Sequence, residues 1–217
     1  MKQGSKARVV IVDDHPIMRM GLRQLLQSSQ LVEVCGEAGS VDEAVSVIDS
    51  LKPVDLVIVD ISLPDRSGLE LIRDLRCLDP GARALVVSSH DERVYAERVL
   101  RLGGRGYLMK DLAPDQLIAA VSRVLAGEIF LSPAMTSRMM EAFSGTKPAS
   151  PISGLTDREL EVFRAIGEGK SSREIAGLLG VSIRTIDAHR THIKEKLGLR
   201  DAAELSYEAI RWMESQA

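Results

Sequence analysis

The sequence lacks the features that would indicate an exported protein, a membrane protein or a binder of large apolar ligands. Aromatic residues make up only 3% of the 217 residues, which disfavours a large apolar ligand pocket. The first apolar run, 9–12, stops at two aspartates and is too short for a signal peptide or a membrane-spanning helix. The two cysteines, Cys35 and Cys77, form no close pair, which argues against a disulfide or a zinc site. We therefore expect a cytoplasmic protein with no membrane partner.

No charge of one sign dominates the chain. Lys and Arg number 28 against 31 Asp and Glu, so the formal net charge is −3, and an overall basic excess that would indicate nucleic-acid binding is missing. A local excess is present, because the segment 183–200 carries five basic residues against two acidic ones. This segment is the first candidate for contact with an anionic partner.

The first 128 residues alternate short β-branched runs with longer amphipathic stretches. This alternation predicts an α/β fold of the flavodoxin-like type, with a five-stranded parallel, doubly wound sheet covered by helices on both faces. In such a fold the functional crevice lies at the carboxyl ends of the strands. The predicted strands are 8–12, 32–37, 55–59, 84–87 and 105–109, and the predicted helices are 16–28, 41–51, 68–77, 92–102 and 114–126.

The rest of the chain predicts a linker and a second, all-α domain. The stretch 144–154 combines Gly, Ser and Lys with two prolines, which is typical of a linker. Four helix starts follow, at the capping residues Thr156, Ser171, Ser182 and Asp201, so a four-helix module is expected. The predicted organisation is a first domain over 1–128, a linker over 129–152 and the second domain over 153–217.

Polar residues close the strands of the predicted sheet. Asp13 and Asp14 close the first strand, Asp60 the third, Ser88 the fourth and Lys110 the fifth. Crowded carboxylates repel one another, and a hard divalent cation such as Mg²⁺ relieves that repulsion. A carboxylate nucleophile, a metal ion, a hydroxyl and an ammonium around one point can together hold a transferring phosphoryl group.

Several of these motifs resemble the receiver domain of response regulators. The resemblance rests on Val12-Asp13-Asp14-His15, on Asp60 followed by Pro64 and Gly68, on Ser88, and on Gly106-Tyr107-Leu108-Met109-Lys110, and it covers about the first 125 residues. It implies that Asp60 is the phosphoacceptor and that Mg²⁺ is bound by Asp14, by Asp60 and by the Ser62 carbonyl, with Asp13 acting through a water.

The same resemblance implies roles for three further residues. Ser88 and Lys110 would each bind a phosphoryl oxygen. Tyr107 would be the switch aromatic, which turns inward when Ser88 moves toward the phosphoryl group. Asp111 follows Lys110 where many receivers have proline, and this Lys-Asp pair looks like the variant of the NarL/FixJ branch.

The carboxy-terminal segment resembles the LuxR-type helix-turn-helix, which places the chain in the NarL/FixJ family. The resemblance rests on the segments 155–159, 172–176 and 181–198. Helical periodicity puts Ile186, Ile193 and Leu197 on one face, so the opposite face is free to enter a major groove. The candidate DNA contacts are Arg184, Thr185, Asp187, Ala188, Thr191, His192, Lys194 and Lys196.

These observations predict a transcription regulator, not an enzyme, whose DNA binding is controlled by phosphorylation of Asp60. The expected partners are a sensor histidine kinase, double-stranded DNA, a second copy of the chain when phosphorylated or on DNA, and RNA polymerase. Dimerisation of the last helix would match an operator with two half-sites. The candidate dimer contacts are Leu205, Ala209, Ile210 and Trp212.

Two alternatives remain open at this point. An aspartyl-phosphate phosphatase would also use an aspartate nucleophile with Mg²⁺, but Ser62 stands where phosphatases of the haloacid dehalogenase type carry a second aspartate. A LuxR-type regulator that responds to a small molecule would share the carboxy-terminal motif. Its ligand domain needs an apolar pocket, whereas this amino-terminal half offers an acidic crevice.

Overall fold

The protein was analysed as a computed structural model that describes residues 6–111, 114–143 and 151–215. The chain divides into two compact units, Met1–Met140 and Glu141–Ala217, and each is described by itself. Within the described ranges, no helix has both the length and the apolar character needed to cross a membrane.

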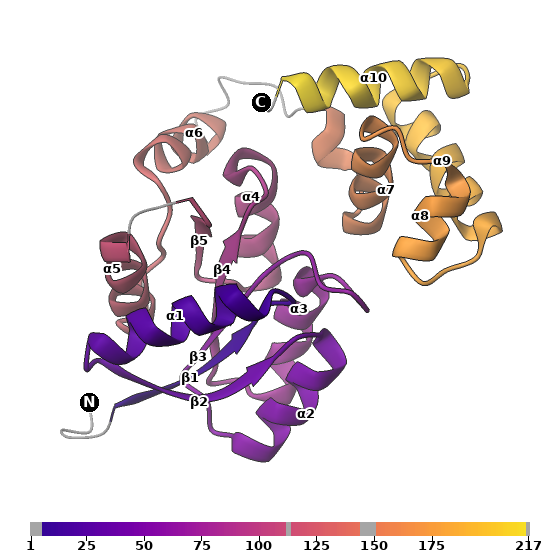
Figure 1. Ribbon diagram of the computed structural model, residues 1–217. Coiled ribbons are helices and arrows are strands. Elements are labelled where there is room, and N and C mark those ends of the chain that lie inside the picture. Colours follow the sequence, from indigo (N-terminus) through magenta and orange to yellow (C-terminus); the bar gives the residue numbers. More distant parts are fainter. Residues whose placement is uncertain (1–5, 112–113, 144–150, 216–217) are drawn as a thin grey trace. The chain divides into compact units, whose positions relative to one another are not determined.

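The first unit is built on a sheet of five parallel strands in the order β2-β1-β3-β4-β5 (Figure 1). This architecture confirms the predicted doubly wound fold. The neighbouring inner strands β1 and β3 are apolar at nearly every position, as expected of strands covered on both faces. The strands are β1 (Ala7–Val12), β2 (Val32–Ala38), β3 (Leu56–Val59), β4 (Arg83–Ser88) and β5 (Gly106–Met109).

Five helices cover the two faces of this sheet (Figure 1). Helices α1 and α5 contact each other on one face, where Leu26 and Val121 join Ile11 and Ile58 of the sheet in the hydrophobic core. Helix α3 packs between α2 and α4 on the other face. The helices are α1 (Pro16–Ser28), α2 (Val41–Leu51), α3 (Gly68–Leu78), α4 (Glu92–Leu102) and α5 (Pro114–Leu125).

The strand order changes direction between β1 and β3, and this arrangement positions the site. Strand β1 lies beside β3, while β2 lies on the opposite side of β1. The connections that leave β1 and β3 therefore diverge to opposite sides, which opens a crevice at the carboxyl ends of these two strands.

The expected linker contains ordered structure. Phe130 forms a parallel bridge with Gly106 at the edge of β5, and helix α6 (Pro133–Phe143) follows three residues later. Met135 in α6 is buried. The segment 129–143 therefore begins as an extension of the first unit.

The second unit consists of a short 3₁₀ turn (Pro151–Gly154) and four helices, as predicted. Capping boxes start α7 at Thr156 and α8 at Ser171, because in each the glutamate at the third helical position accepts the backbone N–H of the capping residue. Gly180 and Gly198 adopt left-handed backbone angles, with φ of 62° and 68°, where α8 and α9 end. The helices are α7 (Asp157–Gly167), α8 (Ser172–Leu178), α9 (Ile183–Leu197) and α10 (Ala202–Glu214).

Candidate functional site

An ammonium group joins two buried carboxylates at the carboxyl ends of the strands. Lys110 Nζ lies 2.7 Å from Oδ2 of Asp13 and 2.7 Å from Oδ2 of Asp60. Asp13 and Asp60 are 1% and 4% exposed. Burial by itself would lower the pKa of Lys110, but the hydrogen bonds to Asp13 and Asp60 outweigh burial and raise it. Lys110 therefore remains a cation that balances both carboxylates.

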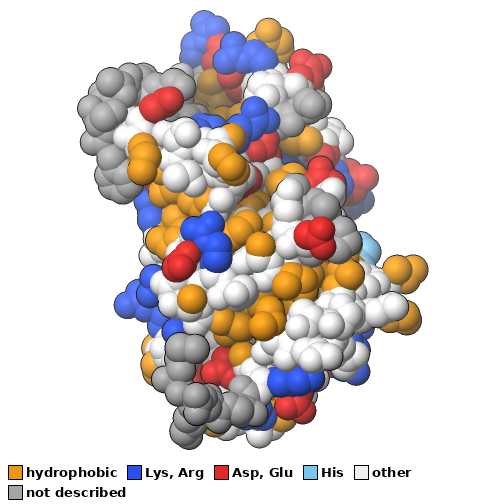
Figure 2. Space-filling view, turned by 90° about the vertical axis from the view of Figure 1, so that its left-hand side faces the viewer, with side chains coloured by type: hydrophobic (Ala, Val, Ile, Leu, Met, Phe, Trp, Pro, Cys, Tyr) orange, Lys and Arg blue, Asp and Glu red, His pale blue; other side chains and the backbone are white. Residues whose placement is uncertain are grey.

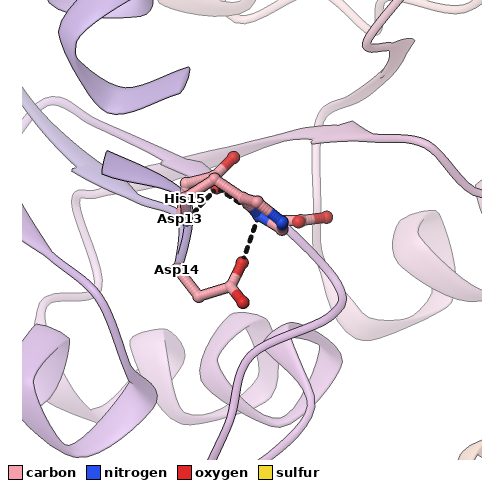
Figure 3. A group of neighbouring side chains, drawn as sticks. Asp13, Asp14 and His15 are labelled. Carbon is pink, nitrogen blue, oxygen red and sulfur yellow. Dashed lines mark hydrogen bonds and ion pairs between the residues drawn. The ribbon is translucent and has the colours of Figure 1, made fainter. Parts of the chain in front are cut away.

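Asp14 and His15 complete an acidic cluster with Asp13 and Asp60, and Figure 3 shows the first three of these neighbouring side chains, Asp13, Asp14 and His15. His15 Nδ1 lies 2.6 Å from Oδ1 of Asp14 and 3.4 Å from Oδ1 of Asp13. One ligand atom from each of Asp13, Asp14, His15 and Asp60 lies within 4.8 Å of the others. His15 was not among the predicted site residues, although its position directly after Asp14 was the signal that could have placed it here. The cluster has the oxygen atoms and the spacing that a metal ion requires.

The loop between β3 and α3 folds back tightly onto Asp60. Gly68 N donates to the Ile61 carbonyl at 2.9 Å, and a Cβ at position 68 would lie only 1.9 Å from the backbone oxygen of Asp60. Asp60 Oδ1 accepts the N–H of Ile61 at 2.7 Å. Glycine is therefore required at position 68 for this loop to hold the Asp60 carboxylate at the crevice.

Tyr107 lies inward, next to the crevice. Its side chain is buried, and its hydroxyl donates to the backbone oxygen of His90 at 2.8 Å. Burial raises the pKa of Tyr107, so the hydroxyl stays neutral and keeps its proton for this bond. Ser88 is also buried, and its hydroxyl oxygen accepts the N–H of His90 at 3.4 Å. His90, in the loop between β4 and α4, therefore bonds to both members of the predicted switch pair, Ser88 at the end of β4 and Tyr107 in β5.

His90 connects this loop to the β3–α3 loop. Its Nε2 and the Ser62 hydroxyl are 2.7 Å apart, and its ring stacks on Tyr95 of α4 with a centroid distance of 5.1 Å. No local pattern in the sequence indicates this contact, because residues 62 and 90 are 28 positions apart. The Ser62 carbonyl as a metal ligand stays a prediction.

Helix α9 presents a polar face to solvent, as its periodicity predicts. Ile186 and Ile193 are fully buried against the rest of the unit. Asp187 is not isolated on this face, because its Oδ1 accepts the Ser172 hydroxyl of α8 at 3.0 Å. Lys194 is half-buried. The exposed residues among the candidate DNA contacts are Arg184, Thr185, Asp187, Ala188, Thr191, His192 and Lys196.

Lys196 also has a role inside the unit that the sequence did not predict. Its Nζ lies 2.6 Å from Oε2 of Glu159, which is 4% exposed and also accepts the N–H of Thr156. The ion pair joins the end of α9 to the start of α7. A phosphate contact by Lys196 would compete with this buried partner.

The candidate dimer contacts on α10 require a correction. Leu205 and Ala209 are fully buried, since α10 packs on α7, so they belong to the core of the unit and cannot form a dimer surface. Trp212 is half-buried and packs on Phe163 with a centroid distance of 5.6 Å. Ile210 is 44% exposed and is free to meet another molecule.

Comparisons with known proteins agree with this architecture. The family of response regulator receiver domains matches residues 9–122, and the luxR family of bacterial regulatory proteins matches residues 153–209. The chain is a response regulator of the NarL/FixJ family. This response regulator is thus a DNA-binding transcription regulator rather than an enzyme.

Relatives align with this response regulator along almost its whole length. The transcriptional regulatory protein UhpA of Salmonella typhimurium is 37% identical over 199 residues, which cover 92% of this chain and 95% of the relative. The nitrate/nitrite response regulator NarL of Escherichia coli is 31% identical over 208 residues, which cover 94% and 95%.

Solved structures of RcsB, one of them of the protein from Salmonella enterica serovar Typhimurium, are also similar to this response regulator. RcsB bound to promoter rprA in the presence of the phosphomimetic BeF₃⁻ has a TM-score of 0.67 and 27% identity, covering 94% of this chain and 98% of that one. A structure of two RcsB dimers bound to two parallel DNAs has a TM-score of 0.59 and 28% identity, covering 94% and 97%.

Proposed function

We propose that Asp60 accepts a phosphoryl group from a histidine kinase and that this event controls DNA binding. The contact of Lys110 with both Asp13 and Asp60 carries the proposal, because it places a cation beside the nucleophile. An oxygen of Asp60 would bond to phosphorus as the bond from phosphorus to the kinase histidine breaks. The electron pair of that bond would return to the imidazole nitrogen. Lys110 would then neutralise a phosphoryl oxygen, and Ser88 would bind another.

We propose that the acidic cluster holds Mg²⁺. Asp14 and Asp60 would bind the ion directly with the Ser62 carbonyl, and Asp13 would act through a water. The four ligand atoms within 4.8 Å support this assignment, since Mg²⁺ prefers carboxylate oxygens and retains several waters. When bound, the ion would neutralise charge on the incoming phosphoryl group.

The surface beside the crevice supports docking of the kinase on α1. Ile17 and Met20 in α1 are 85% and 66% exposed, close in sequence to Asp13 and Asp14. Hydrophobic side chains gather on the side of the unit where α1 and α5 lie (Figure 2), and a hollow of about 130 Å³ there is lined by Met18, among others. A partner helix with an apolar face fits such a surface. With this kinase and DNA as partners, we place the protein in the cytoplasm.

We propose that α9 reads the major groove through its exposed face. Arg184, Thr191 and His192 would approach base edges and backbone, and Lys194 would meet a phosphate. The DNA-bound RcsB dimers support the proposal that two copies bind together, with Ile210 of α10 as a contact. RNA polymerase stays an expected partner at the promoter.

The matched ranges 9–122 and 153–209 support a receiver domain within 1–128 and a DNA-binding domain within 153–217. We propose 129–152 as the connecting segment, of which 133–143 is helical.

A phosphotransfer experiment tests the function. The wild type and Asp60→Asn are incubated with Mg²⁺ and acetyl phosphate, and intact mass and DNA affinity are measured. We expect the wild type to gain one phosphoryl group and to change its affinity, and Asp60→Asn to do neither. Asp49→Asn, which removes an exposed carboxylate in α2, serves as the control and should behave as the wild type. A phosphorylated Asp60→Asn protein would refute the assignment.

A further inference from the structure

Helix α6 begins at a capping serine whose own N–H requires an acceptor from elsewhere. Ser132 Oγ accepts the N–H of Met135 at 3.0 Å, and the Ser132 carbonyl accepts the N–H of Thr136 at 2.9 Å. In α7 and α8 the glutamate at the third helical position accepts the N–H of the capping residue. The third position of α6 is Met135, whose side chain has no carboxylate to accept the N–H of Ser132.

Glu92 of α4 supplies the missing acceptor. The N–H of Ser132 donates to Oε1 of Glu92 at 2.9 Å, across 40 positions of sequence. The capping box of α6 is therefore completed by a residue of another helix. The carboxylate is also favourable in charge, because the amino-terminal end of a helix carries a partial positive charge.

The same bond closes a ring of contacts that includes the switch tyrosine. The Tyr107 hydroxyl donates to the backbone oxygen of His90, two residues before Glu92. The Tyr107 N–H donates to the backbone oxygen of Phe130 at 3.0 Å, two residues before Ser132. The side chain and the backbone of Tyr107 thus hold the two segments that the bond between Glu92 and Ser132 joins.

The fit of the connecting segment against β5 is close. Gly106 forms the bridge to Phe130, and a Cβ at position 106 would lie 2.9 Å from the Phe130 oxygen. The Phe130 N–H also donates to the Arg105 carbonyl at 2.9 Å. The position of the start of α6 therefore depends on the positions of β5 and of the first turn of α4.

We propose that Glu92 is a positioning residue that couples the start of α6 to the inward position of Tyr107. This inference rests on the proposed function. An outward movement of Tyr107 breaks its bond to the His90 oxygen, releases the first turn of α4 and withdraws the acceptor of Ser132. Phosphorylation of Asp60, by keeping Tyr107 inward, holds the start of α6 on the first unit.

Hydrogen exchange of the Ser132 amide, measured by NMR on the full chain with and without BeF₃⁻ and Mg²⁺, tests this coupling. We expect BeF₃⁻ to slow exchange in the wild type. Glu92→Ala should raise the rate by about tenfold and abolish the response to BeF₃⁻, because the acceptor is lost. Glu92→Gln keeps an acceptor oxygen and should retain most of the protection. Glu97→Ala, which removes an exposed glutamate of the same helix, should leave the rate unchanged.

A second pair of variants separates coupling from simple loss of structure. Tyr107→Phe removes only the hydroxyl, and we expect it to raise Ser132 exchange. Its effect and that of Glu92→Ala should not add, because both open the same ring. The Thr156 amide, which is bonded to Glu159 in the second unit, should be unaffected in every variant.

Two results would overturn the inference while leaving the proposed function intact. One is unchanged Ser132 exchange in Glu92→Ala, and the other is an equal response to BeF₃⁻ in Glu92→Ala and the wild type. In both cases mass spectrometry would still show phosphate on Asp60. Absence of that phosphate in the wild type would instead refute the proposed function. If the coupling exists, Glu92→Ala is phosphorylated at the normal rate but loses the change in DNA affinity.

Discussion

The ammonium of Lys110 lies 2.7 Å from Oδ2 of Asp60, and it makes an equally short contact with Asp13. One cation therefore holds together two carboxylates that burial and mutual repulsion would otherwise destabilise. The same cation lies where negative charge would increase on phosphorylation. Stability and function thus depend on one side chain at this crevice.

Lys110→Met should destabilise the first unit. Two buried carboxylates would lose their partner, at a cost of about 3 kcal/mol in the free energy of unfolding without Mg²⁺. Added Mg²⁺ should restore part of that loss, since a divalent cation can take over the neutralisation. Urea unfolding with and without MgCl₂ measures both effects. Lys52→Met, which removes a partly exposed ion pair with Asp49, should cost little, and an equal loss in both variants would contradict the argument.

Gly68→Ala should disrupt the loop that carries Asp60. A Cβ 1.9 Å from the Asp60 oxygen forces the backbone to move, so we expect a loss of more than about 2 kcal/mol and slower phosphorylation by acetyl phosphate. Gly21→Ala in α1 is the matched control, because nothing lies within 4 Å of its Cβ. That variant should be slightly more stable than the wild type. Equal phosphorylation rates in the two variants would refute the role of Gly68.

The second unit should lose stability at acid pH because Glu159 becomes protonated. Burial would raise the pKa of Glu159, but hydrogen bonds from Lys196 and from Thr156 outweigh burial and lower it. The pKa in the folded state is therefore below that in the unfolded state. The stabilisation is present above the unfolded pKa, roughly 4.3, and is lost as pH falls through the folded pKa.

The measurement compares the wild type with Glu159→Gln by urea unfolding at successive pH values. Trp212, the only tryptophan of the chain, packs on Phe163 and reports unfolding of this unit by fluorescence. We expect the wild type to be more stable by about 1 kcal/mol at neutral pH, and the difference to shrink toward acid. A difference that stays constant from pH 7 to pH 3 would show that the ion pair with Lys196 adds nothing.

Substitutions at Leu205 and Ile210 should distinguish the part that α10 plays in folding from its part in association. Leu205→Ala removes a fully buried side chain and should cost about 2–5 kcal/mol by Trp212 fluorescence. Ile210→Ser changes an exposed position and should alter stability by less than about 0.5 kcal/mol. It should, however, weaken binding of two copies to a two-site DNA fragment, as measured by sedimentation. Unchanged association of Ile210→Ser would exclude Ile210 from the dimer contact.

Much of the architecture was predictable because its signals are local. Apolar runs of four residues specify β1 and β3, and capping residues such as Thr156 and Ser171 lie directly before the helices they start. The crevice was predictable for a related reason. Asp13, Asp60 and Lys110 each follow a strand immediately, and parallel strands bring such positions to one edge of the sheet.

The dimer contacts were predicted less well, because periodicity identifies an apolar face without identifying what covers it. Leu205 and Ala209 have the spacing of an exposed apolar stripe, but α7 covers them. Lys196 looked like a phosphate contact because its charge is visible in the sequence, whereas its partner Glu159 lies 37 positions away.

The sequence by itself determined the order of strands and helices, the residue types at the ends of the strands and the amphipathic face of α9, since each depends on neighbours a few positions apart. Only the tertiary structure decided that His90 meets Ser62, that Lys196 pairs with Glu159 and that Glu92 caps α6. These contacts join residues 28 to 40 positions apart. Their formation depends on how whole elements pack, and no local pattern in the chain encodes that geometry.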